Sequence, residues 1–481
     1  MKYEPVIGLE VHAQIHTRSK MFCSCPVVED TGDLPPNTYV CPVCTAMPGV
    51  LPVINRRAVE MTILTGLALN CEINSITVFS RKNYFYPDLP KGYQISQYDL
   101  PLCADGYLEI ETENGTRRIG ITRAHLEEDA GKLYHVDGVS LVDFNRAGVP
   151  LIEIVSQPDM RSVEEVRAYA TKLHSILVYL GVNSGDMEKG VMRFEANVSV
   201  RPVGSNVLNP RHEIKNLNSF RALTRSVAYE IEQQIATLEA GDTVVQQTMG
   251  WDETRGITVP QRGKEHAHDY RYFPEPDLPP LEISREWVEE VRAQLPELPD
   301  AKRARFIAEY GLSAYDAGVL VADKDVADYY EAAVAVGKAD PKTVANWVTG
   351  ALFRLMKETG QEIGALLVSP QALAELIGLV EDGTINLNTG KEVLAEMFAS
   401  GRGARQIVEE RGLAQVSDVA ALGKIVTQVL EENPAQVSKY LSGKVQVLGW
   451  LMGQVMRATR GKANPQVVRE LLQAQLEARR G

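Results

Sequence analysis

The chain has 481 residues, 44% of them hydrophobic and 23% charged, which is the composition of an ordinary globular protein. This length exceeds what a single hydrophobic core usually supports, so we expect two to four domains. No run approaches the 18 consecutive apolar residues of a membrane span, and the N-terminus lacks the apolar stretch of a secretory signal. These features argue against a membrane or secreted protein, and we expect a cytoplasmic one.

The net charge of −13 is distributed unevenly along the chain. From Val437 to the C-terminus, eight basic residues stand against two acidic ones, so this segment alone carries +6. A positively charged segment on an acidic protein is typical of a surface that binds nucleic acid. The alternative is the solvated face of an ordinary helix.

The sequence changes character along its length. Residues 1 to about 290 contain short strand-like runs, turn signals and prolines, whereas helical patterns take over from about Ser284. A proline-marked linker and a later pair of glycines separate the parts. We therefore predict an α+β fold with a β-rich domain at 1–293, a helical domain at 294–405 and a small helical tail at 406–481.

The first strand-like run, residues 6–15, alternates between apolar and other side chains. Successive side chains of a strand point to opposite sides, so the apolar residues share one face. The other face carries Glu10 and His12. A carboxylate and an imidazole two residues apart can share a cation, and the alternative is a half-buried strand with a solvated polar face.

Four cysteines stand in two close pairs, Cys23-x-Cys25 and Cys41-x-x-Cys44. Two such pairs on separate loops suit tetrahedral zinc, and four thiolates fill its coordination sphere. We therefore predict a structural zinc site in an insertion at 23–44. The alternatives are cysteines that merely pack and a disulfide within the loop.

Several charged residues follow in segments that suggest binding. An aromatic and basic loop at 81–97 includes Lys82, a candidate for holding a nucleotide or an RNA end, unless the loop is only a packed surface. A predicted hairpin at 106–129 ends in three consecutive acids, including Glu128, which are either solvated or held by a cation. Glu153 is the only charge in an apolar strand-like run, where it needs a cation or an ion-pair partner.

A further alternating run, residues 191–201, has one apolar and one polar face. The polar residues are Arg193, Glu195, Asn197, Ser199 and Arg201. Short hydrogen-bonding side chains with two arginines resemble the wall of a phosphate or carboxylate site, and Lys215 adds a cation. The sequence lacks a G-x-x-x-x-G-K-[ST] phosphate loop, so ATP chemistry would lie on an antiparallel sheet. Hard carboxylate ligands suit magnesium, which usually accompanies nucleotide phosphates.

Together these motifs resemble a known family. The runs that carry the resemblance include Val-Ile-Gly-Leu-Glu-Val-His ending at His12, Arg-Lys-Asn-Tyr-Phe-Tyr-Pro-Asp at 81–88, Pro-Leu-Ile-Glu-Ile-Val at 150–155, Lys-Asn-Leu-Asn-Ser-Phe at 215–220 and Asp-Tyr-Arg-Tyr-Phe-Pro-Glu-Pro-Asp at 269–277. They are similar to the GatB family, one of the subunits of the aspartyl/glutamyl-tRNA(Asn/Gln) amidotransferase. The tail run at 448–465 resembles the C-terminal domain of the same family, so the similarity extends through essentially the whole chain.

The resemblance implies a fold and a reaction. Residues 1–293 are expected to form a cradle-shaped domain like the catalytic fold of glutamine synthetase. In this family that domain uses ATP to phosphorylate the side-chain carboxylate of Glu-tRNA(Gln) or Asp-tRNA(Asn). Ammonia, released from glutamine by a separate amidase subunit, then displaces the phosphate. The chain is thus expected to belong to an ATP-dependent carbon–nitrogen ligase with glutamine as amido donor.

The resemblance further implies an assembly that acts on tRNA. The family works as a heterotrimer with the amidase and a small third subunit. The tail at 406–481 resembles the YqeY family and is expected to contact tRNA.

The resemblance also implies roles for single residues. The family's magnesium positions fall on His12, Glu128 and Glu153. We expect a catalytic set of Glu10, Lys82, Arg193 and Glu195. We expect an ATP-binding set of Arg193, Asn197, Arg201 and Lys215. The four cysteines occur in only part of the family, so zinc is a prediction from their spacing.

Two other classes of protein explain parts of the sequence. A zinc-containing RNA-binding module without catalysis explains the cysteines and the basic tail, but not carboxylates that share one face of a strand. A small-molecule ligase of the glutamine-synthetase type explains the cradle, but not the tail. ATP hydrolysis that depends on charged tRNA distinguishes all three.

Overall fold

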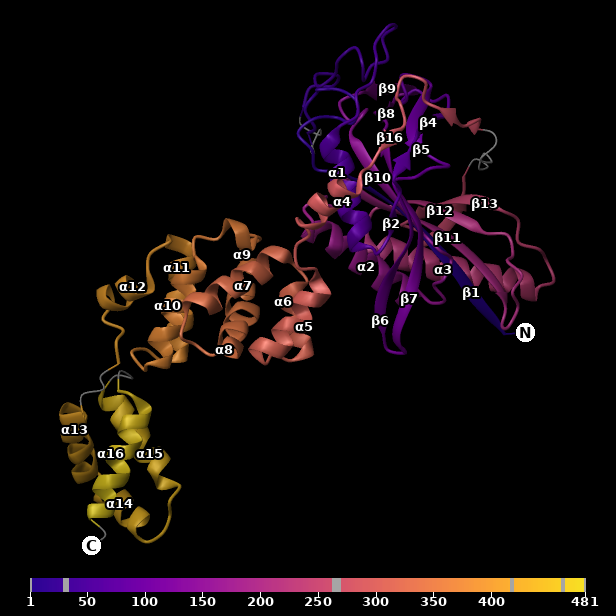
Figure 1. The fold of residues 1–481 in the computed structure, drawn as a ribbon. Coiled ribbons are helices and arrows are strands. Elements are labelled where there is room, and N and C mark those ends of the chain that lie inside the picture. The colour runs from indigo at the N-terminus through magenta and orange to yellow at the C-terminus, as the bar shows by residue number, and fades with distance from the viewer. Residues whose placement is uncertain (1, 29–33, 262–269, 416–418, 460–462, 480–481) are drawn as a thin grey trace. The chain divides into compact units, whose positions relative to one another are not determined.

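The computed structural model describes residues 2–28, 34–261, 270–415, 419–459 and 463–479 (Figure 1). The chain divides into two compact units, Met1–Pro299 and Asp300–Gly481. Among the described residues, the buried hydrophobic side chains form one cluster in the first unit and two in the second. The second unit thus contains two separate cores, one between residues 306 and 408 and one between residues 422 and 476.

A large sheet forms the framework of the first unit. Its described strands are β1 (Tyr3–Gln14), β2 (Glu72–Ile73), β4 (Phe79–Asn83), β5 (Tyr93–Gln97), β6 (Cys103–Thr112), β7 (Gly115–Glu128), β10 (Pro150–Ser156), β11 (Met192–Pro202), β12 (His212–Leu217), β13 (Gln247–Asp252), β14 (Ile257–Pro260) and β15 (Phe273–Pro274). Their order is β14-β13-β12-β11-β1-β10-β7-β5-β4-β15, with β6 paired to β7 and β2 paired to β6. Every described pair in this sheet is antiparallel except β12 with β13, which is parallel.

The register of the central strands gathers the predicted site residues. His12 on β1 lies opposite Glu153 on β10 and opposite Arg193 on β11. Glu153 in turn lies opposite His125 on β7. Residues directly opposite each other in a sheet point to the same face. The pairing therefore concentrates charged side chains at the centre of one face.

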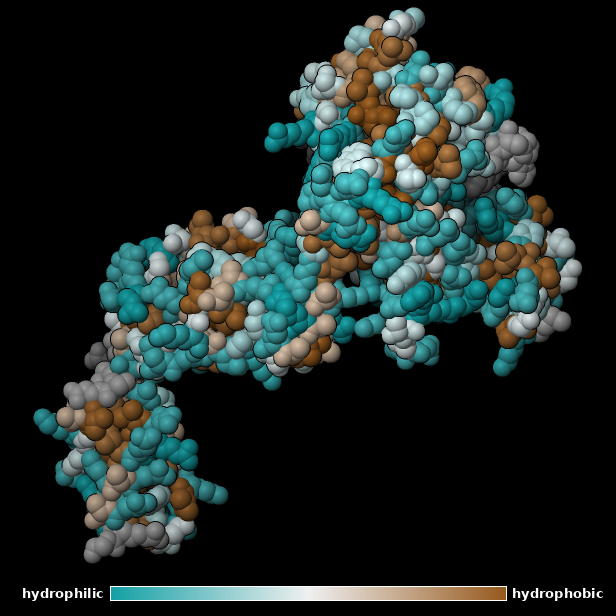
Figure 2. All heavy atoms as spheres, viewed as in Figure 1, coloured by the Kyte–Doolittle hydropathy of each residue, from teal (hydrophilic) through white to brown (hydrophobic). Residues whose placement is uncertain are grey.

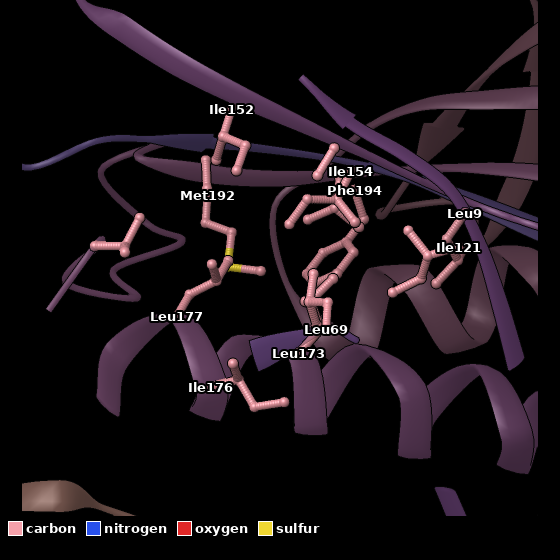
Figure 3. Packing of buried hydrophobic residues seen from close by; sticks show 14 of the residues in the cluster. Leu9, Leu69, Ile121, Ile152, Ile154, Leu173, Ile176, Leu177, Met192 and Phe194 are labelled. Carbon is pink, nitrogen blue, oxygen red and sulfur yellow. The ribbon is translucent and has the colours of Figure 1, made fainter. Parts of the chain in front are cut away.

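The other face of the sheet packs on helices. Figure 3 shows Ile152, Phe194 and Met192 of the strands beside Leu173 and Leu177 of α2 (Val163–Tyr179). The helix begins after Ser162, whose hydroxyl accepts a hydrogen bond from the Glu165 backbone N–H. The other described helices of this unit are α1 (Arg56–Ala68), α3 (Phe220–Glu239) and α4 (Arg285–Arg292). Alternation along the strands thus leaves the polar side chains on the face away from α2.

The described elements that begin at Pro299 or later are helices. The described helices are α5 (Pro299–Tyr310), α6 (Ala314–Val321), α7 (Lys324–Val336), α8 (Pro341–Asn346), α9 (Phe353–Thr359), α10 (Pro370–Glu381), α11 (Leu387–Ser400), α12 (Ala404–Glu410), α13 (Val419–Glu432), α14 (Pro434–Leu441), α15 (Val447–Ala458) and α16 (Pro465–Ala478). A π-helix, η2 (Trp347–Leu352), joins α8 to α9 without a break, and η3 (Ile363–Ala365) is a short 3₁₀ turn. The prediction of an α+β fold is confirmed, because a large, mostly antiparallel sheet precedes a helical C-terminal region.

Among the described strands, two short ribbons stand outside the large sheet, β3 (Ile76–Thr77) with β16 (Leu281–Glu282) and β8 (Lys132–Val136) with β9 (Val139–Asp143). Figure 2 shows hydrophobic side chains gathered around the position of β8 and β9. Val136, Val139 and Leu141 of this ribbon are about half exposed. No described helix is long and apolar enough to cross a membrane.

Candidate active site

A cavity of about 1060 Å³ opens on the polar face of the sheet. Side chains from β1, β4, β7, β10, β11 and β12 line it. Of the residues predicted from the sequence, the cavity is lined by Glu10, His12, Lys82, Glu153, Arg193, Glu195 and Lys215. Strand runs that lie far apart in the sequence thus contribute to one site.

One group of candidate metal ligands consists of His12, Glu127 and Glu153. Nε2 of His12 lies 3.6 Å from Oε1 of Glu127 and 3.4 Å from Oε2 of Glu153. Oxygen and imidazole donors at these separations suit a divalent cation of the magnesium type. Nδ1 of His12 is buried and has no described hydrogen-bond partner, so the ring faces the two carboxylates through Nε2.

Electrostatics in this cluster favour a bound cation. Burial and the neighbouring Glu153 raise the pKa of Glu127. Burial also opposes ionisation of Glu153, but the imidazoles of His125 and His12 hold the pKa of that carboxyl well below its usual range. Two adjacent buried carboxylates repel each other when both are ionised, and a divalent cation removes that repulsion.

Glu128, which the sequence argument placed among the magnesium ligands, points away from the cavity. Oε1 of Glu128 accepts a hydrogen bond from the Ile95 backbone N–H at 3.0 Å and lies 2.5 Å from Nζ of Lys91. Neighbouring residues of a strand face opposite sides, and β7 turns Glu127 toward His12. The geometry therefore favours His12, Glu127 and Glu153 as one group of candidate ligands, with Glu128 outside it. His125 and Glu127 are two residues apart, as Glu10 and His12 are, so the two side chains of each pair point to the same face of a strand. This spacing was the signal in the sequence that could have indicated Glu127.

A second group of candidate ligands consists of Glu10, Glu195 and Glu213. Glu10 lies directly opposite Glu195 in the β1–β11 pair. Nζ of Lys215 lies 3.3 Å from Oε2 of Glu195 and 3.7 Å from Oε1 of Glu213. Three carboxylates around one ammonium leave an excess of negative charge, which a second cation fits. Sequence reasoning missed Glu213.

Cationic side chains surround both groups. Nη2 of Arg193 lies 3.4 Å from Oδ1 of Asp129. Burial opposes the charge on Lys82, yet the neighbouring Tyr272 and Glu127 raise its pKa above the usual value. Lys82 therefore stays charged inside the cavity. Arg193, Lys82 and Lys215 are suited to neutralising phosphate oxygens.

Two of the residues expected to bind ATP, Asn197 and Arg201, do not line the cavity. Arg201 does not line the cavity, and its Nε donates a hydrogen bond to Oε1 of Glu4 at 2.7 Å. Asn197 donates from Nδ2 to Oε1 of Glu10 at 2.8 Å and thereby orients that carboxylate. For Arg201, a structural ion pair at the end of a strand describes the geometry better than a phosphate contact.

Aromatic residues form part of the wall and were only partly foreseen. Tyr84 and Tyr86 belong to the loop recognised in the sequence, and their rings stack with centroids 5.8 Å apart. Tyr270 and Tyr272 come from a distant segment, and Tyr272 stacks on Tyr98 at 4.1 Å. Pairing of β4 with β15 brings these two segments together, which no local pattern reveals.

The four cysteines come together as predicted, each offering one sulfur within 4.8 Å of the others. Sγ of Cys41 and Sγ of Cys44 are 3.9 Å apart, close to the roughly 3.8 Å edge of a tetrahedron with 2.3 Å zinc–sulfur bonds. Contact with Cys23 lowers the pKa of Cys44 to about 4 against the effect of burial, and Nζ of Lys20, 3.6 Å away, adds to this. The donor set therefore fits zinc.

Comparison with known proteins identifies the family of the chain. Residues 5–289 match the family model described as the GatB/GatE catalytic domain, and residues 328–476 match the model described as the GatB domain. The chain is 58% identical over 480 residues to the GatB subunit of the aspartyl/glutamyl-tRNA(Asn/Gln) amidotransferase of Moorella thermoacetica, covering 99% of this chain and 100% of that protein. It is 57% identical to the protein of the same name from Roseiflexus castenholzii, covering 99% of each chain, and 54% identical to that from Caldanaerobacter subterraneus, covering 99% of this chain and all of the relative. The chain therefore belongs to the GatB family.

Proposed function

We propose that this chain is the subunit of a glutamine-dependent tRNA amidotransferase that activates and amidates the side chain of a mischarged aminoacyl-tRNA. The substrates are Glu-tRNA(Gln), Asp-tRNA(Asn) or both, and the products are Gln-tRNA(Gln) and Asn-tRNA(Asn). The observation that carries the proposal is one cavity that brings two groups of candidate metal ligands together with six lysine or arginine side chains. The enzyme is an ATP-dependent carbon–nitrogen ligase.

The chemistry requires activation. A carboxylate does not react with ammonia at neutral pH, because an oxide would have to leave. Attack of the side-chain carboxylate on the γ-phosphorus of ATP releases ADP and forms an acyl phosphate. Ammonia then attacks the carbonyl carbon, phosphate leaves, and loss of a proton gives the amide. Both steps develop negative charge on phosphate oxygens, which preorganised cations stabilise.

The side chains of the cavity suit these steps. His12, Glu127 and Glu153 would hold one magnesium ion, and Glu10, Glu195 and Glu213 a second. Bound magnesium would neutralise and orient the transferring phosphoryl group. Lys82, Arg193 and Lys215 would contact the remaining phosphate oxygens. Asn197 is a positioning residue, because it acts through Glu10.

The three-part organisation remains a proposal. A cradle at 1–293 like the glutamine synthetase catalytic fold would hold the reaction, followed by a helical domain at 294–405 and a YqeY-like tail at 406–481. Separate hydrophobic clusters in residues 306–408 and 422–476 support the last division. The +6 charge from Val437 onward supports contact of the tail with tRNA.

Zinc is proposed as a structural ion at Cys23, Cys25, Cys41 and Cys44. Four thiolates leave no open position, so the ion would stabilise the insertion at 23–44 without taking part in catalysis. Elemental analysis of protein purified without chelator should give about one zinc per chain. A Cys23–Cys25 disulfide in reduced protein, or the absence of zinc, would contradict this assignment.

Partner proteins supply the nitrogen. The relatives are named as one subunit of an amidotransferase. We propose two partners in a cytoplasmic heterotrimer: an amidase, which releases ammonia from glutamine, and a small third subunit. The exposed apolar side chains of β8 and β9 support an assembly, because such patches commonly mark protein interfaces.

The experiment that tests the function uses the purified heterotrimer. ATP cleavage, amide formation on tRNA and glutamine hydrolysis are measured separately, with Glu-tRNA(Gln) and Asp-tRNA(Asn) in parallel. We expect ATP cleavage that requires mischarged tRNA. Cleavage with free glutamate alone would indicate a small-molecule ligase, and tRNA binding without any ATP cleavage would indicate an RNA-binding module.

A further inference from the structure

A hollow of about 320 Å³ lies in the helical unit, formed entirely by residues 346–391. One wall is a single side of the continuous helix α8–η2–α9, and the other is the first two turns of α11. Its volume is at the small end of the range for ligand sites and suits one nucleotide rather than a double helix. None of its residues belongs to the cavity of the sheet.

The helix that forms the first wall contains a π turn. η2 interrupts the α-helical pattern at Trp347–Leu352, and π turns of this kind occur frequently at functional sites. Asn346, Gly350 and Arg354, spaced by four residues, all line the hollow. The irregular turn thus lies where the helix borders the hollow.

Gly350 keeps the hollow open. A Cβ atom at this position would meet no atom within 4 Å beyond the helix's own nearby backbone. Its φ is not positive, so neither strain nor close packing requires glycine there, although glycine in a helix costs about 1 kcal/mol relative to alanine. Gly390 on α11 differs, because a Cβ atom there would lie 3.0 Å from Cη2 of Trp347. Packing therefore explains Gly390, whereas Gly350 is explained by the space it leaves.

Floor and rim differ in chemistry. Trp347, which is 5% exposed, and the exposed Leu387 provide apolar surface. Asn346, Arg354 and Lys391 supply an amide and two cations at exposed positions. The guanidinium of Arg354 lies 3.8 Å from Glu358, a mostly exposed pair that contributes little. Lys391 has no ion pair with any residue that the structure describes.

Apolar surface beneath a cationic rim matches the chemistry of an unstacked nucleotide. The base covers apolar or aromatic surface, and arginine or lysine contacts the phosphate. We propose that this hollow binds one unstacked nucleotide of the tRNA, with the base over Gly350 between Trp347 and Leu387 and the phosphate at Arg354 and Lys391. The proposal rests on the proposed function for the identity of the RNA.

The first test fills the hollow without changing charge. Binding of uncharged tRNA to the purified heterotrimer is compared for wild type, Gly350→Leu and the control Gly378→Leu. Gly378 on α10 is also a helical glycine with open space at its Cβ position, but it does not line the hollow. We expect Gly350→Leu to weaken binding roughly tenfold, the effect of losing one stacked base, and Gly378→Leu to change it little. Circular dichroism and hydrogen exchange are used to check that both variants are folded.

The second test removes charge. Arg354→Ala and Lys391→Ala should each weaken binding and reduce the slope of log affinity against log salt by roughly one unit, as for a lost phosphate contact. Lys338→Ala removes one exposed charge in the same unit outside the hollow and serves as control. Chemical probing of the tRNA should show one nucleotide that loses protection in Gly350→Leu.

The outcomes separate the explanations. Equal tRNA affinity of Gly350→Leu and Gly378→Leu overturns the proposal, even if the charge variants bind less tightly, because surface cations would then act alone. Loss of heterotrimer assembly with unchanged tRNA affinity of the assembled fraction also overturns it and indicates a peptide in the hollow. Binding of uncharged tRNA requires no chemistry, so failure of wild type to amidate mischarged tRNA would refute only the proposed function.

Discussion

The two faces of the central sheet differ in what their side chains do. On β11, Phe194 is fully buried and packs against Phe220 at the start of α3, with ring centroids 5.9 Å apart. Its neighbours Arg193 and Glu195 line the cavity. A single step along one strand thus separates a core position from a site position. The comparison teaches that substitutions at adjacent residues should fall into two classes, one that lowers stability and one that lowers activity.

The largest effect is expected on the core face. Phe194→Ala should destabilise the first unit by about 3–5 kcal/mol, because it removes a buried ring and leaves a cavity. Hydrogen exchange of peptides from β10 and α2 measures this locally. A local measurement matters because we expect a chain with several hydrophobic cores to unfold in more than one step. Phe194→Leu serves as a milder variant if Phe194→Ala fails to fold. Unchanged exchange in both would show that Phe194 contributes no core packing.

On the cavity face, Glu153→Gln should lower activity and spare the fold. The amide keeps the shape of the side chain but removes one charged ligand of the cluster. Transfer-RNA-dependent ATP cleavage should fall by roughly a hundredfold or more, the scale of stabilisation that a metal supplies in phosphoryl transfer. Glutamine hydrolysis in the assembled heterotrimer should fall much less. Normal ATP cleavage would remove Glu153 from the metal site, and a misfolded variant would identify it as a structural ion-pair partner.

Glu127 and Glu128 sharpen the comparison to two adjacent residues. Glu127→Gln should raise the magnesium concentration needed for half-maximal ATP cleavage by at least about tenfold, because it weakens a ligand. Glu128→Gln should leave that concentration unchanged, because its carboxylate bonds Lys91 and Ile95 on the opposite side. A titration of magnesium in the presence of mischarged tRNA measures both. Equal shifts for the two variants would restore Glu128 to the metal site.

Alternation within one strand was readable from the sequence, and pairing between strands was not. The runs at 6–15 and 191–201 placed Glu10, His12, Arg193 and Glu195 on polar faces, and all four line the cavity. The sequence did not distinguish Glu127 from Glu128, because three consecutive acids at the end of a hairpin do not reveal which of them turns inward. The structure resolves this through the register of β7 with β10, in which His125 lies opposite Glu153.

The residues that sequence reasoning missed depend on contacts across long separations. Glu213 joins Glu10 and Glu195 because β12 pairs with β11, and Tyr272 reaches the cavity wall after β15 pairs with β4. Arg201 lies on the same face of its strand as Arg193 but eight residues farther along it, beside Glu4. Whether a residue is at an odd or an even position decides which face of the sheet its side chain is on. Whether it reaches the site depends on its position along the strand and on which strands pair with that strand.

The smallest effect is expected for a hydroxyl group on the core face. Tyr169 on α2 is fully buried, and its hydroxyl has no hydrogen-bond partner among the described residues. Tyr329 in the helical unit is also buried, but its hydroxyl donates to the Val368 carbonyl at 2.9 Å. Tyr169→Phe should therefore change stability by no more than about 0.5 kcal/mol or raise it, because an unbonded hydroxyl gains nothing from burial. Tyr329→Phe should cost about 0.5–1.5 kcal/mol of stability, because it removes a hydrogen bond and leaves a buried carbonyl unsatisfied.

Hydrogen exchange of peptides from α2 and α7 measures the two changes separately. A cost for Tyr169→Phe as large as that for Tyr329→Phe would mean that the hydroxyl of Tyr169 has a partner, such as a buried water, and that the core face of the sheet is less purely apolar than its side chains indicate.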